Sequence, residues 1–356
     1  MITEGEVRAA LAEVPYPGLR RDIVSLGMLR SVAVRDGRVH VSLTLSTERQ
    51  DVPDLLRRGV VERLARAGAI RTEVQLLTPE RRAAEQDPWR NQGRLSNART
   101  VIAVGAGKGG VGKSTVAVNL ALALQATGAR VGVLDADIYG PSVPLLLGLE
   151  DGAARAQMTL EKQLLPLEAH GLSVISFGFF LGAQSPAVWR GPMVSKAVTQ
   201  FARGVVWPDL DYLVVDLPPG TGDVPLSLAQ AIVIDGAVVV TTPQRLATVE
   251  AAKAVDMFRT LDVPVLGVVE NMSRAVCACG TVSHPFGSNG GDRLAAAADL
   301  SLLGELPFAD GVVEGGDHGA PPMVSAPDSI YAQAMRHVAS SVQRALAGAS
   351  SLRASA

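Results

Sequence analysis

Hydrophobic and polar residues follow two different patterns along this chain of 356 residues. In the first part, helical spacing alternates with apolar–polar alternation of period two, and Asp36-Gly37 separates two alternating runs. Such alternation around Asp-Gly predicts a β-hairpin. The expected elements are a helix over 3–13, strands over 28–35 and 38–46, a helix over 54–67 and a strand over 70–77. We therefore predict a small α+β domain over residues 1–82, which is large enough to fold alone.

From residue 100 the pattern changes to short, continuously apolar runs rich in β-branched residues. These runs occupy residues 101–104, 131–134, 212–215, 237–240 and 265–269. Helical patterns separate most of them, and this alternation is typical of a parallel sheet covered by helices on both faces. We predict an α/β domain with a mostly parallel sheet over residues 100–347. Residues 83–99 lack periodicity and gain Pro, Gly, Asn and Gln, so they predict a linker.

The end of the chain predicts an amphipathic helix over 330–347, followed by a flexible tail over 348–356. The helix has no Trp or Phe beside its apolar residues, so packing on the domain explains it better than attachment to a membrane surface. The longest uncharged stretch, 172–189, contains serines, glycines and Pro186. We expect it to be buried strand and loop rather than a membrane span.

Composition narrows the classes of function. The chain is 47% hydrophobic, 19% charged and carries a net charge of −2, so it is globular and has no overall positive charge to attract nucleic acid. Two cysteines exclude a disulfide-stapled secreted scaffold. The N-terminus has no apolar targeting segment. We expect a cytoplasmic protein that binds neither nucleic acid nor membrane.

A glycine-rich segment follows the first strand of the second domain. Residues 107–114 read GKGGVGKS, which matches G-x-x-x-x-G-K-[ST], and a helix is expected over 115–125. Glycines let backbone N–H groups turn toward a phosphate chain, and the helix N-terminus adds partial positive charge. Lys113 should reach the β- and γ-phosphates, and Ser114 should bind Mg²⁺. The predicted nucleotide site comprises Gly107, Lys108, Gly109, Gly110, Val111, Gly112, Lys113, Ser114 and Thr115.

Lys108 is a second lysine inside this loop, which the motif does not require. Supplied by a second subunit, it would act like an arginine finger beside the γ-phosphate. A solvated loop lysine is the alternative. We predict that Lys108, Lys113 and Asp137 are catalytic.

Acidic residues follow two of the apolar runs. Asp137 comes after 131–134 and Asp216 after 212–215, and the carboxyl ends of parallel strands meet at one edge of the sheet. Asp137 is suited to orienting the attacking water, and Asp216 to supporting Mg²⁺ together with Ser114. For Asp135, which also follows a strand, a helix-capping role is at least as good an explanation as a catalytic one.

Both cysteines lie in one tripeptide, Cys277-Ala278-Cys279. A disulfide between residues two apart is strained, so we do not expect one. Thiolates in a loop suit a metal, but an iron–sulfur or zinc site needs four ligands, which a symmetric dimer would supply. Two buried structural cysteines are an equally good reading of the residues alone. His284 is a further possible ligand, although we expect it to form a local hydrogen bond instead.

Several segments together resemble a known family. GKGGVGKST, DADIYGPS and VVDLPPGTGD resemble the deviant P-loop ATPases, which include the chromosome- and septum-positioning ATPases and the nitrogenase iron protein. DADIYGPSVP, DLPPGTGD and VVENMS narrow the resemblance, over residues 98–345, to the Mrp/ApbC-type iron–sulfur cluster carriers. The first 80 residues resemble the small cluster-assembly domain that often precedes the ATPase in that family, mainly through DIVSLGMLRSVAVRDGRVHVSLTL.

The resemblance implies a P-loop NTPase fold and an ATP-dependent iron–sulfur cluster carrier. Such a carrier binds a cluster and transfers it to apo-proteins, with slow, Mg²⁺-dependent ATP hydrolysis as the switch. The family further implies a homodimer in which Lys108 contacts nucleotide across the interface. Asn271 would lie near the adenine base with Pro243 beside it. Expected partners are apo iron–sulfur proteins and cluster scaffold proteins.

For the cysteines, the resemblance implies a labile [4Fe–4S] cluster that Cys277 and Cys279 hold across the dimer. The spacing here is C-x-C where the family has C-x-x-C, so the cluster type stays open. Val313 stands where the family often has an arginine. The alternatives are a positioning ATPase of the ParA/MinD kind and a chaperone for another thiophilic metal.

Overall fold

The computed structural model describes residues 2–17, 22–26, 28–35, 38–44, 52–77, 93–150, 157–159, 163–180, 191–277 and 279–354. The chain divides into two compact units, Met1–Arg90 and Asn91–Ala356. The division falls within the segment 83–99 that we predicted as a linker, of which residues 83–92 lie outside the described residues.

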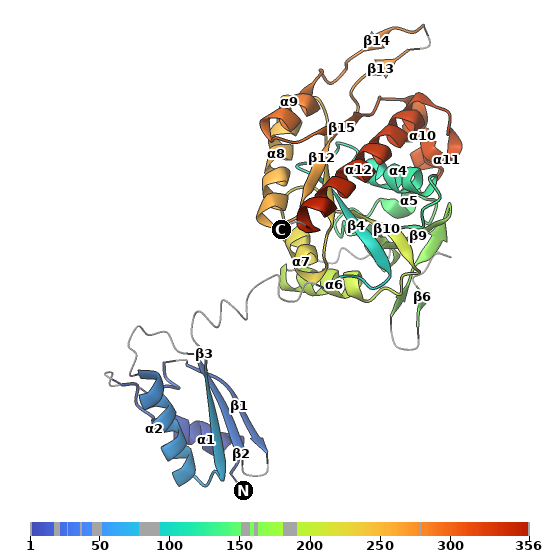
Figure 1. Ribbon diagram of the computed structural model, residues 1–356. Coiled ribbons are helices and arrows are strands. Elements are labelled where there is room, and N and C mark those ends of the chain that lie inside the picture. Colours follow the sequence, from blue (N-terminus) through green and yellow to red (C-terminus); the bar gives the residue numbers. More distant parts are fainter. Residues whose placement is uncertain are drawn as a thin grey trace. The chain divides into compact units, whose positions relative to one another are not determined.

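In its described residues, the first unit contains a three-stranded sheet and two helices (Figure 1). Its elements are α1 (Glu4–Leu11), β1 (Leu29–Arg35), β2 (Arg38–Thr44), α2 (Val52–Arg66) and β3 (Arg71–Leu77). β1 and β2 pair antiparallel, as the hairpin prediction requires, and β2 pairs parallel with β3. Val39, Val41 and Leu43 alternate along β2 and are buried in one core with residues of α2. The predicted Asp36-Gly37 turn lies outside the described residues.

The second unit contains an eight-stranded sheet in the order β15-β12-β11-β4-β10-β5-β9-β8. Neighbouring strands run parallel, apart from β8, which is antiparallel to β9. The strands are β4 (Ala98–Ala106), β5 (Val131–Asp135), β8 (Leu167–Ala169), β9 (Leu172–Ser176), β10 (Leu210–Asp216), β11 (Gly236–Thr241), β12 (Val265–Glu270) and β15 (Leu302–Glu305). The five strands predicted from continuous apolar runs form its contiguous centre, from β12 to β5. The mostly parallel α/β fold is therefore confirmed.

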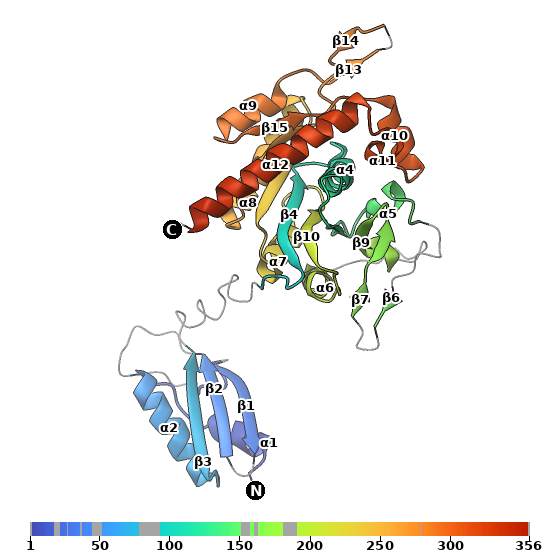
Figure 2. The same cartoon turned by 45° about the vertical axis from the view of Figure 1, so that its right-hand side comes forward.

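Two short hairpins and several helices surround this sheet. The hairpins are β6 (Gln157–Met158) with β7 (Leu164–Leu165), and β13 (Ala275–Val276) with β14 (Val282–Ser283). The helices are α4 (Lys113–Gln125), α5 (Val143–Leu146), η1 (Phe177–Phe179), α6 (Gly191–Arg203), α7 (Asp223–Ala231), α8 (Arg245–Thr260), α9 (Gly290–Ala297), α10 (Asp310–Asp317), α11 (Pro322–Ser325) and α12 (Ile330–Ala354). In Figures 1 and 2 the β13–β14 hairpin projects from the body of this unit.

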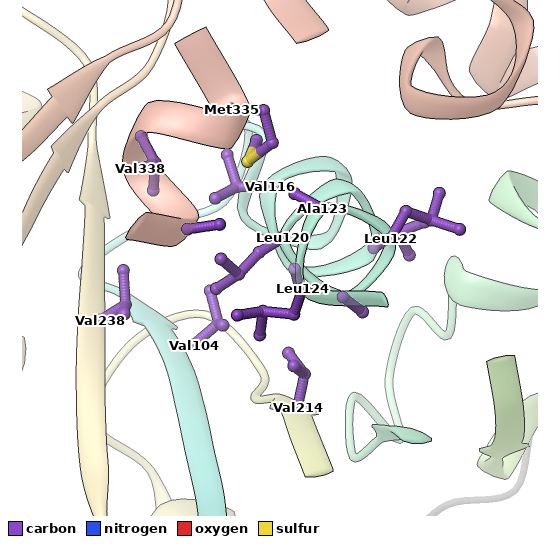
Figure 3. Packing of buried hydrophobic residues seen from close by; sticks show 14 of the residues in the cluster. Val104, Val116, Leu120, Leu122, Ala123, Leu124, Val214, Val238, Met335 and Val338 are labelled. Atoms are coloured by element: carbon purple, nitrogen blue, oxygen red, sulfur yellow. The ribbon is translucent and has the colours of Figure 1, made fainter. Parts of the chain in front are cut away.

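Helices cover both faces of the sheet. On one face α4 and α12 lie side by side, and Leu120 of α4 packs near Val104 of β4 (Figure 3). On the other face lies α8, because a Cβ on Gly105, the neighbour of Val104, would meet the Phe258 ring at 2.8 Å. The buried α4 thus fixes the loop before it against the carboxyl end of β4.

The last helix, α12, continues past Ala347 to Ala354, which corrects the predicted flexible tail over 348–356. The added segment contains no proline, and a single glycine costs a helix only about 1 kcal/mol relative to alanine. Tyr331, Met335 and Val338 of α12 are buried in the core of this unit. The prediction that this helix packs on the domain is therefore confirmed. Among the helices that the structure describes, none has the length and apolarity needed to cross a membrane.

Candidate functional site

The loop between β4 and α4 has a backbone path that requires glycine. A Cβ on Gly107 would lie 2.0 Å from the Glu250 carbonyl oxygen of α8. Gly110 and Gly112 have φ of +80° and +79°, which side chains rarely allow. A Cβ on Gly112 would also lie 2.3 Å from Asn271 Nδ2. The loop is therefore held by neighbours on two sides, and its own backbone surrounds the N-terminus of α4.

Lys113 lies buried among carboxylates at the end of this loop. Its Nζ is 2.5 Å from Asp216 Oδ1 and 4.0 Å from Asp137 Oδ2. It also donates a hydrogen bond to Ser114 Oγ at 3.1 Å. Four residues that sequence motifs placed in one site, from three different segments, are thus brought together as predicted.

Asp216 offers an unused oxygen at this point. It is fully buried, and its Oδ2 has no hydrogen-bond partner within the described part of the chain. Burial raises the pKa of Asp216, while the Lys113 ammonium opposes that rise. A carboxylate oxygen without a partner, close to the Ser114 hydroxyl, is a donor set that suits Mg²⁺.

Asp135 supports the segment that carries Asp137. Its carboxylate accepts hydrogen bonds from the Asp137 N–H at 3.1 Å, the Val143 N–H at 3.3 Å and the Ser176 hydroxyl at 2.8 Å. Because Val143 begins α5, the contact to its N–H is that of a helix cap, the explanation offered for Asp135 from the sequence. Burial and the nearby Asp216 carboxylate raise the pKa of Asp135 to about 7.

Lys108 lies half-buried in the loop and forms no hydrogen bond or ion pair with any described residue. Nearby, Asp137 lines a hollow of about 500 Å³ between two segments that follow β5 and β10. The first segment contributes Tyr139, whose side chain is largely exposed, and the second contributes Pro218 and Asp223. Lys108 thus has no partner among the described residues, and the largely buried Asp137 reaches the wall of this hollow.

A second hollow, of about 210 Å³, is lined in part by Gly112 and Thr115. Asn271 lines it, and its Nδ2 donates to the Val111 carbonyl at 2.9 Å. Pro243 is not among the lining residues. Instead it packs on Gly290 at the start of α9, where a Cβ would lie 2.3 Å from its carbonyl oxygen. The expected contact of Pro243 with a base therefore gains no support.

Several residues of this hollow were not foreseen from the sequence. Pro307, Phe308 and Val313 come from the segment after β15, and Tyr331 comes from α12. The Tyr331 hydroxyl is buried and has no hydrogen-bond partner among the described residues. No local pattern marks these positions, because only the strand order brings β15 beside β12. Val313, at which the family resemblance led us to expect arginine, is 58% exposed at this hollow.

The structure joins Cys277 and Cys279 by a disulfide, which corrects our expectation that these residues would not pair. Gly280 follows the pair in a turn. With a φ of +84° it reverses the chain, and its N–H donates to the Cys277 carbonyl at 2.8 Å. This turn leaves the two Cα atoms 5.3 Å apart, which is within the usual range for a disulfide. Both cysteines are exposed at the end of the β13–β14 hairpin, which also excludes the reading as buried structural cysteines.

His284 forms the local hydrogen bond that we expected. Its Nδ1 lies 3.0 Å from the Ser273 carbonyl oxygen, across the base of the hairpin. Within the described residues, no group of three or more His, Cys, Asp and Glu side chains could hold a metal ion. One chain therefore presents only two sulfur atoms at this place.

Two family models match the chain. One, described as the NUBPL iron-transfer P-loop NTPase, matches residues 97–343. The other, described as an iron-sulfur cluster assembly protein, matches residues 4–76. The two matches fall on the two units of the structure.

Whole-length relatives carry one name. A Salmonella typhimurium protein named iron-sulfur cluster carrier protein is 43% identical over 338 residues, covering 94% of this chain and 90% of that protein. A Deinococcus radiodurans protein of the same name is 44% identical over 344 residues, covering 97% of this chain and 95% of that protein.

Solved structures resemble the second unit. A nucleotide-binding protein from Archaeoglobus fulgidus, in complex with ADP, is 38% identical with a TM-score of 0.56, covering 64% of this chain and 88% of that one. The Pyrococcus furiosus cell division ATPase MinD has a TM-score of 0.52 at 19% identity, covering 69% of this chain and 99% of that one. The second likeness concerns the fold alone.

Gly112→Ala should destabilise the protein, because the new Cβ meets Asn271 Nδ2 and the backbone has a positive φ. We expect a loss of about 1–3 kcal/mol and a fall in Tm of several degrees, measured by calorimetry without nucleotide. Gly109→Ala is the matched control, since a Cβ there has nothing within 4 Å. Equal losses in the two variants would contradict this account of the loop.

Asp135 should make the nucleotide-free protein less stable at high pH. Its pKa is raised from 3.8 to about 7, so between these values the folded state binds more protons than the unfolded state. Stability from this group therefore falls as pH rises through that window and is constant above it. We expect Asp135→Asn to remove a loss of about 2 kcal/mol between pH 5.5 and 7.5. Urea titrations at both pH values measure this.

Asp256→Asn, at an exposed position of α8, is the control for that titration. It should leave the pH dependence of the unfolding free energy as in the unmodified protein. Parallel pH profiles for Asp135→Asn and the unmodified protein would show that Asp135 does not titrate in this window.

Proposed function

The chain belongs to the family of iron–sulfur cluster carrier proteins, and from this premise we propose how its residues bind a nucleotide and carry a cluster. It is a P-loop ATPase and an iron–sulfur cluster carrier, with apo iron–sulfur proteins as recipients. One observation supports the proposal most. A phosphate-type loop with a buried lysine and an exposed cysteine pair occur in one unit, and Asn271, which contacts the loop, lies six residues before Cys277.

We propose that the phosphates of ATP lie in the loop Gly107–Thr115. Lys113 then exchanges the Asp216 carboxylate for the β- and γ-phosphates, so its buried charge is paired in both states. The adenosine part fits the hollow beside Gly112, against Asn271 and Phe308. The Tyr331 ring lines the same hollow, although its hydroxyl is buried.

Ser114 and Asp216 are the residues that would hold Mg²⁺, which supplies charge neutralisation at the phosphate oxygens. Asp137 faces the hollow that follows β5 and β10, and there it would orient the attacking water. Lys108, which has no partner within the described chain, would neutralise the phosphate charge of a second copy. Hydrolysis is slow, because this chemistry serves as a switch.

Cluster binding needs the cysteines as thiolates, since disulfide sulfurs are not iron ligands. Reduction by an external dithiol adds two electrons and two protons to the Cys277–Cys279 bond and leaves two thiols. Two copies facing each other then supply the four sulfur ligands of a [4Fe–4S] cluster. Because both cysteines are exposed, the cluster is accessible to scaffold and recipient proteins in the cytoplasm.

A positioning ATPase has less support. The likeness to MinD is at 19% identity and concerns the fold alone. Such a function would also leave the cysteine hairpin without a role, and α12 packs in the core rather than presenting an apolar face. A chaperone for another thiophilic metal would use the same two sulfurs, and metal loading distinguishes it.

Lys108→Ala should lower kcat for phosphate release by about 10³-fold, the scale of a missing arginine finger. Mixing Lys108→Ala chains with Lys113→Ala chains should restore activity, because each mixed dimer then has one complete site. Lys253→Ala, an exposed lysine paired with Glu250, is the control and should leave kcat unchanged. Failure of the mixture to recover activity would contradict a lysine that acts across a dimer.

The double variant Cys277→Ser, Cys279→Ser should bind no cluster and retain ATP binding. After reduction and anaerobic loading with iron and sulfide, we expect about four irons per dimer in the unmodified protein and none in the variant. Lys113→Ala is the matched control, losing ATP binding but keeping the iron. Iron uptake by the double variant would refute the site, and uptake of zinc without iron and sulfide would favour the other-metal chaperone.

A further inference from the structure

The cysteine hairpin and the hollow beside Gly112 share the same supporting residues. The chain leaves β12 at Glu270, lines the hollow with Asn271 and Met272, and enters β13 at Ala275. The other side of the hollow is lined by the segment Pro307–Ala309, which follows β15. These two segments run side by side at the base of the hairpin.

Backbone hydrogen bonds join the two segments. The Ser273 N–H and hydroxyl both donate to the Leu306 carbonyl, at 3.0 and 3.1 Å. The Phe308 N–H donates to the Arg274 carbonyl at 2.7 Å. Ala275 of β13 forms a parallel bridge with Phe308. Phe308 is therefore in direct contact with the first residues of the hairpin.

The returning side of the hairpin is tied to the same place. His284 follows β14 directly, and its Nδ1 lies 3.0 Å from the Ser273 carbonyl oxygen. Two residues later, the Phe286 ring packs edge-on against the Phe308 ring, with centroids 6.3 Å apart. Ser273 and Phe308 thus hold both ends of the hairpin, while Cys277 and Cys279 lie at its exposed turn.

The residues that precede the hairpin also contact the phosphate-binding loop. Asn271 donates to the Val111 carbonyl, and Met272 lines the hollow with a φ of +57°, a conformation that a residue with a side chain adopts only when its surroundings fix it. Asn271 also donates its own N–H to the Thr241 carbonyl at 2.8 Å. Asn271 and Met272 are therefore held between the phosphate-binding loop and the hairpin. Together with Ser273 and Phe308 they connect the two without a gap.

We propose that Ser273, His284 and Phe308 are positioning residues through which a nucleotide in the hollow controls the accessibility of Cys277 and Cys279. The proposal rests on the proposed function only in assigning adenosine to the hollow. A ligand against Phe308 and Met272 fixes the base of the hairpin and restricts the motion of its turn. Linkage between two binding sites is reciprocal. If nucleotide changes the affinity of the two sulfurs for a ligand by some factor, that ligand changes the affinity for nucleotide by the same factor.

The test measures the reactivity of the cysteines in the full chain without metal. The chain is reduced with a dithiol, desalted anaerobically and treated with N-ethylmaleimide, with and without MgADP, and peptide mass spectrometry gives the rates at Cys277 and Cys279. We expect MgADP to slow alkylation about fivefold or more, the lower end of typical coupling between sites.

Variants at His284 isolate the connection, because this residue does not line the hollow. In His284→Ala, MgADP should change the alkylation rate by close to onefold. The Kd for MgADP should stay within about twofold of that of the unmodified protein, because no residue that lines the hollow is changed. His284→Asn, whose amide nitrogen can replace Nδ1 as the donor, should restore most of the effect. Val282→Ala, at an exposed position on β14, is the control and should keep the full effect.

Two results would overturn the proposal. One is alkylation that MgADP does not change in the unmodified protein although it binds, and the other is a full MgADP effect in His284→Ala. Neither involves iron, so the proposal can fail while cluster loading stands. A chain that takes up no cluster can equally show the complete nucleotide effect, which keeps the two conclusions separate.

Discussion

The site is organised around the ion pair between Lys113 and Asp216. Both groups are buried, and a buried charge without a partner costs several kcal/mol, so each depends on the other until a ligand replaces one of them. The strand order places Asp216 and Asp135 on neighbouring strands, where their carboxylates repel each other. The raised pKa of Asp135 relieves part of this repulsion without nucleotide. The positive charge of Lys113 thus offsets the negative charge of the carboxylates at the carboxyl ends of these strands.

Much of this site could be predicted from the sequence, because its parts obey local rules. Continuous apolar runs marked the five central strands, and the ends of two of them brought Asp137 and Asp216 to the glycine-rich loop. The family resemblance, drawn from the same segments, is confirmed by relatives over most of the chain. These inferences succeeded because the carboxyl ends of parallel strands lie at one edge of the sheet whatever the strand order is.

The parts that escaped prediction depend on distant contacts or on local backbone geometry. Phe308 and Tyr331 reach the hollow beside Gly112 only because β15 lies next to β12 and α12 crosses the same face. The disulfide was missed because spacing alone suggested strain, whereas the two Cα atoms lie 5.3 Å apart, within the usual range for a disulfide. The end of α12 was missed because small residues after Ala347 look like a tail, although nothing in them stops a helix.

The disulfide has a consequence for the durability of the protein in air. Exposed thiolates are oxidised stepwise to sulfinic and sulfonic acids. Ordinary reductants do not return those products to thiols. A sulfur that is already bonded to its neighbour is withdrawn from this sequence, and a dithiol restores it. Because Cys277 and Cys279 pair within one chain, each protects the other from further oxidation while the disulfide is formed. The C-x-C spacing therefore allows an oxidised form of the two sulfurs that a dithiol can reverse, unlike the sulfinic and sulfonic acids.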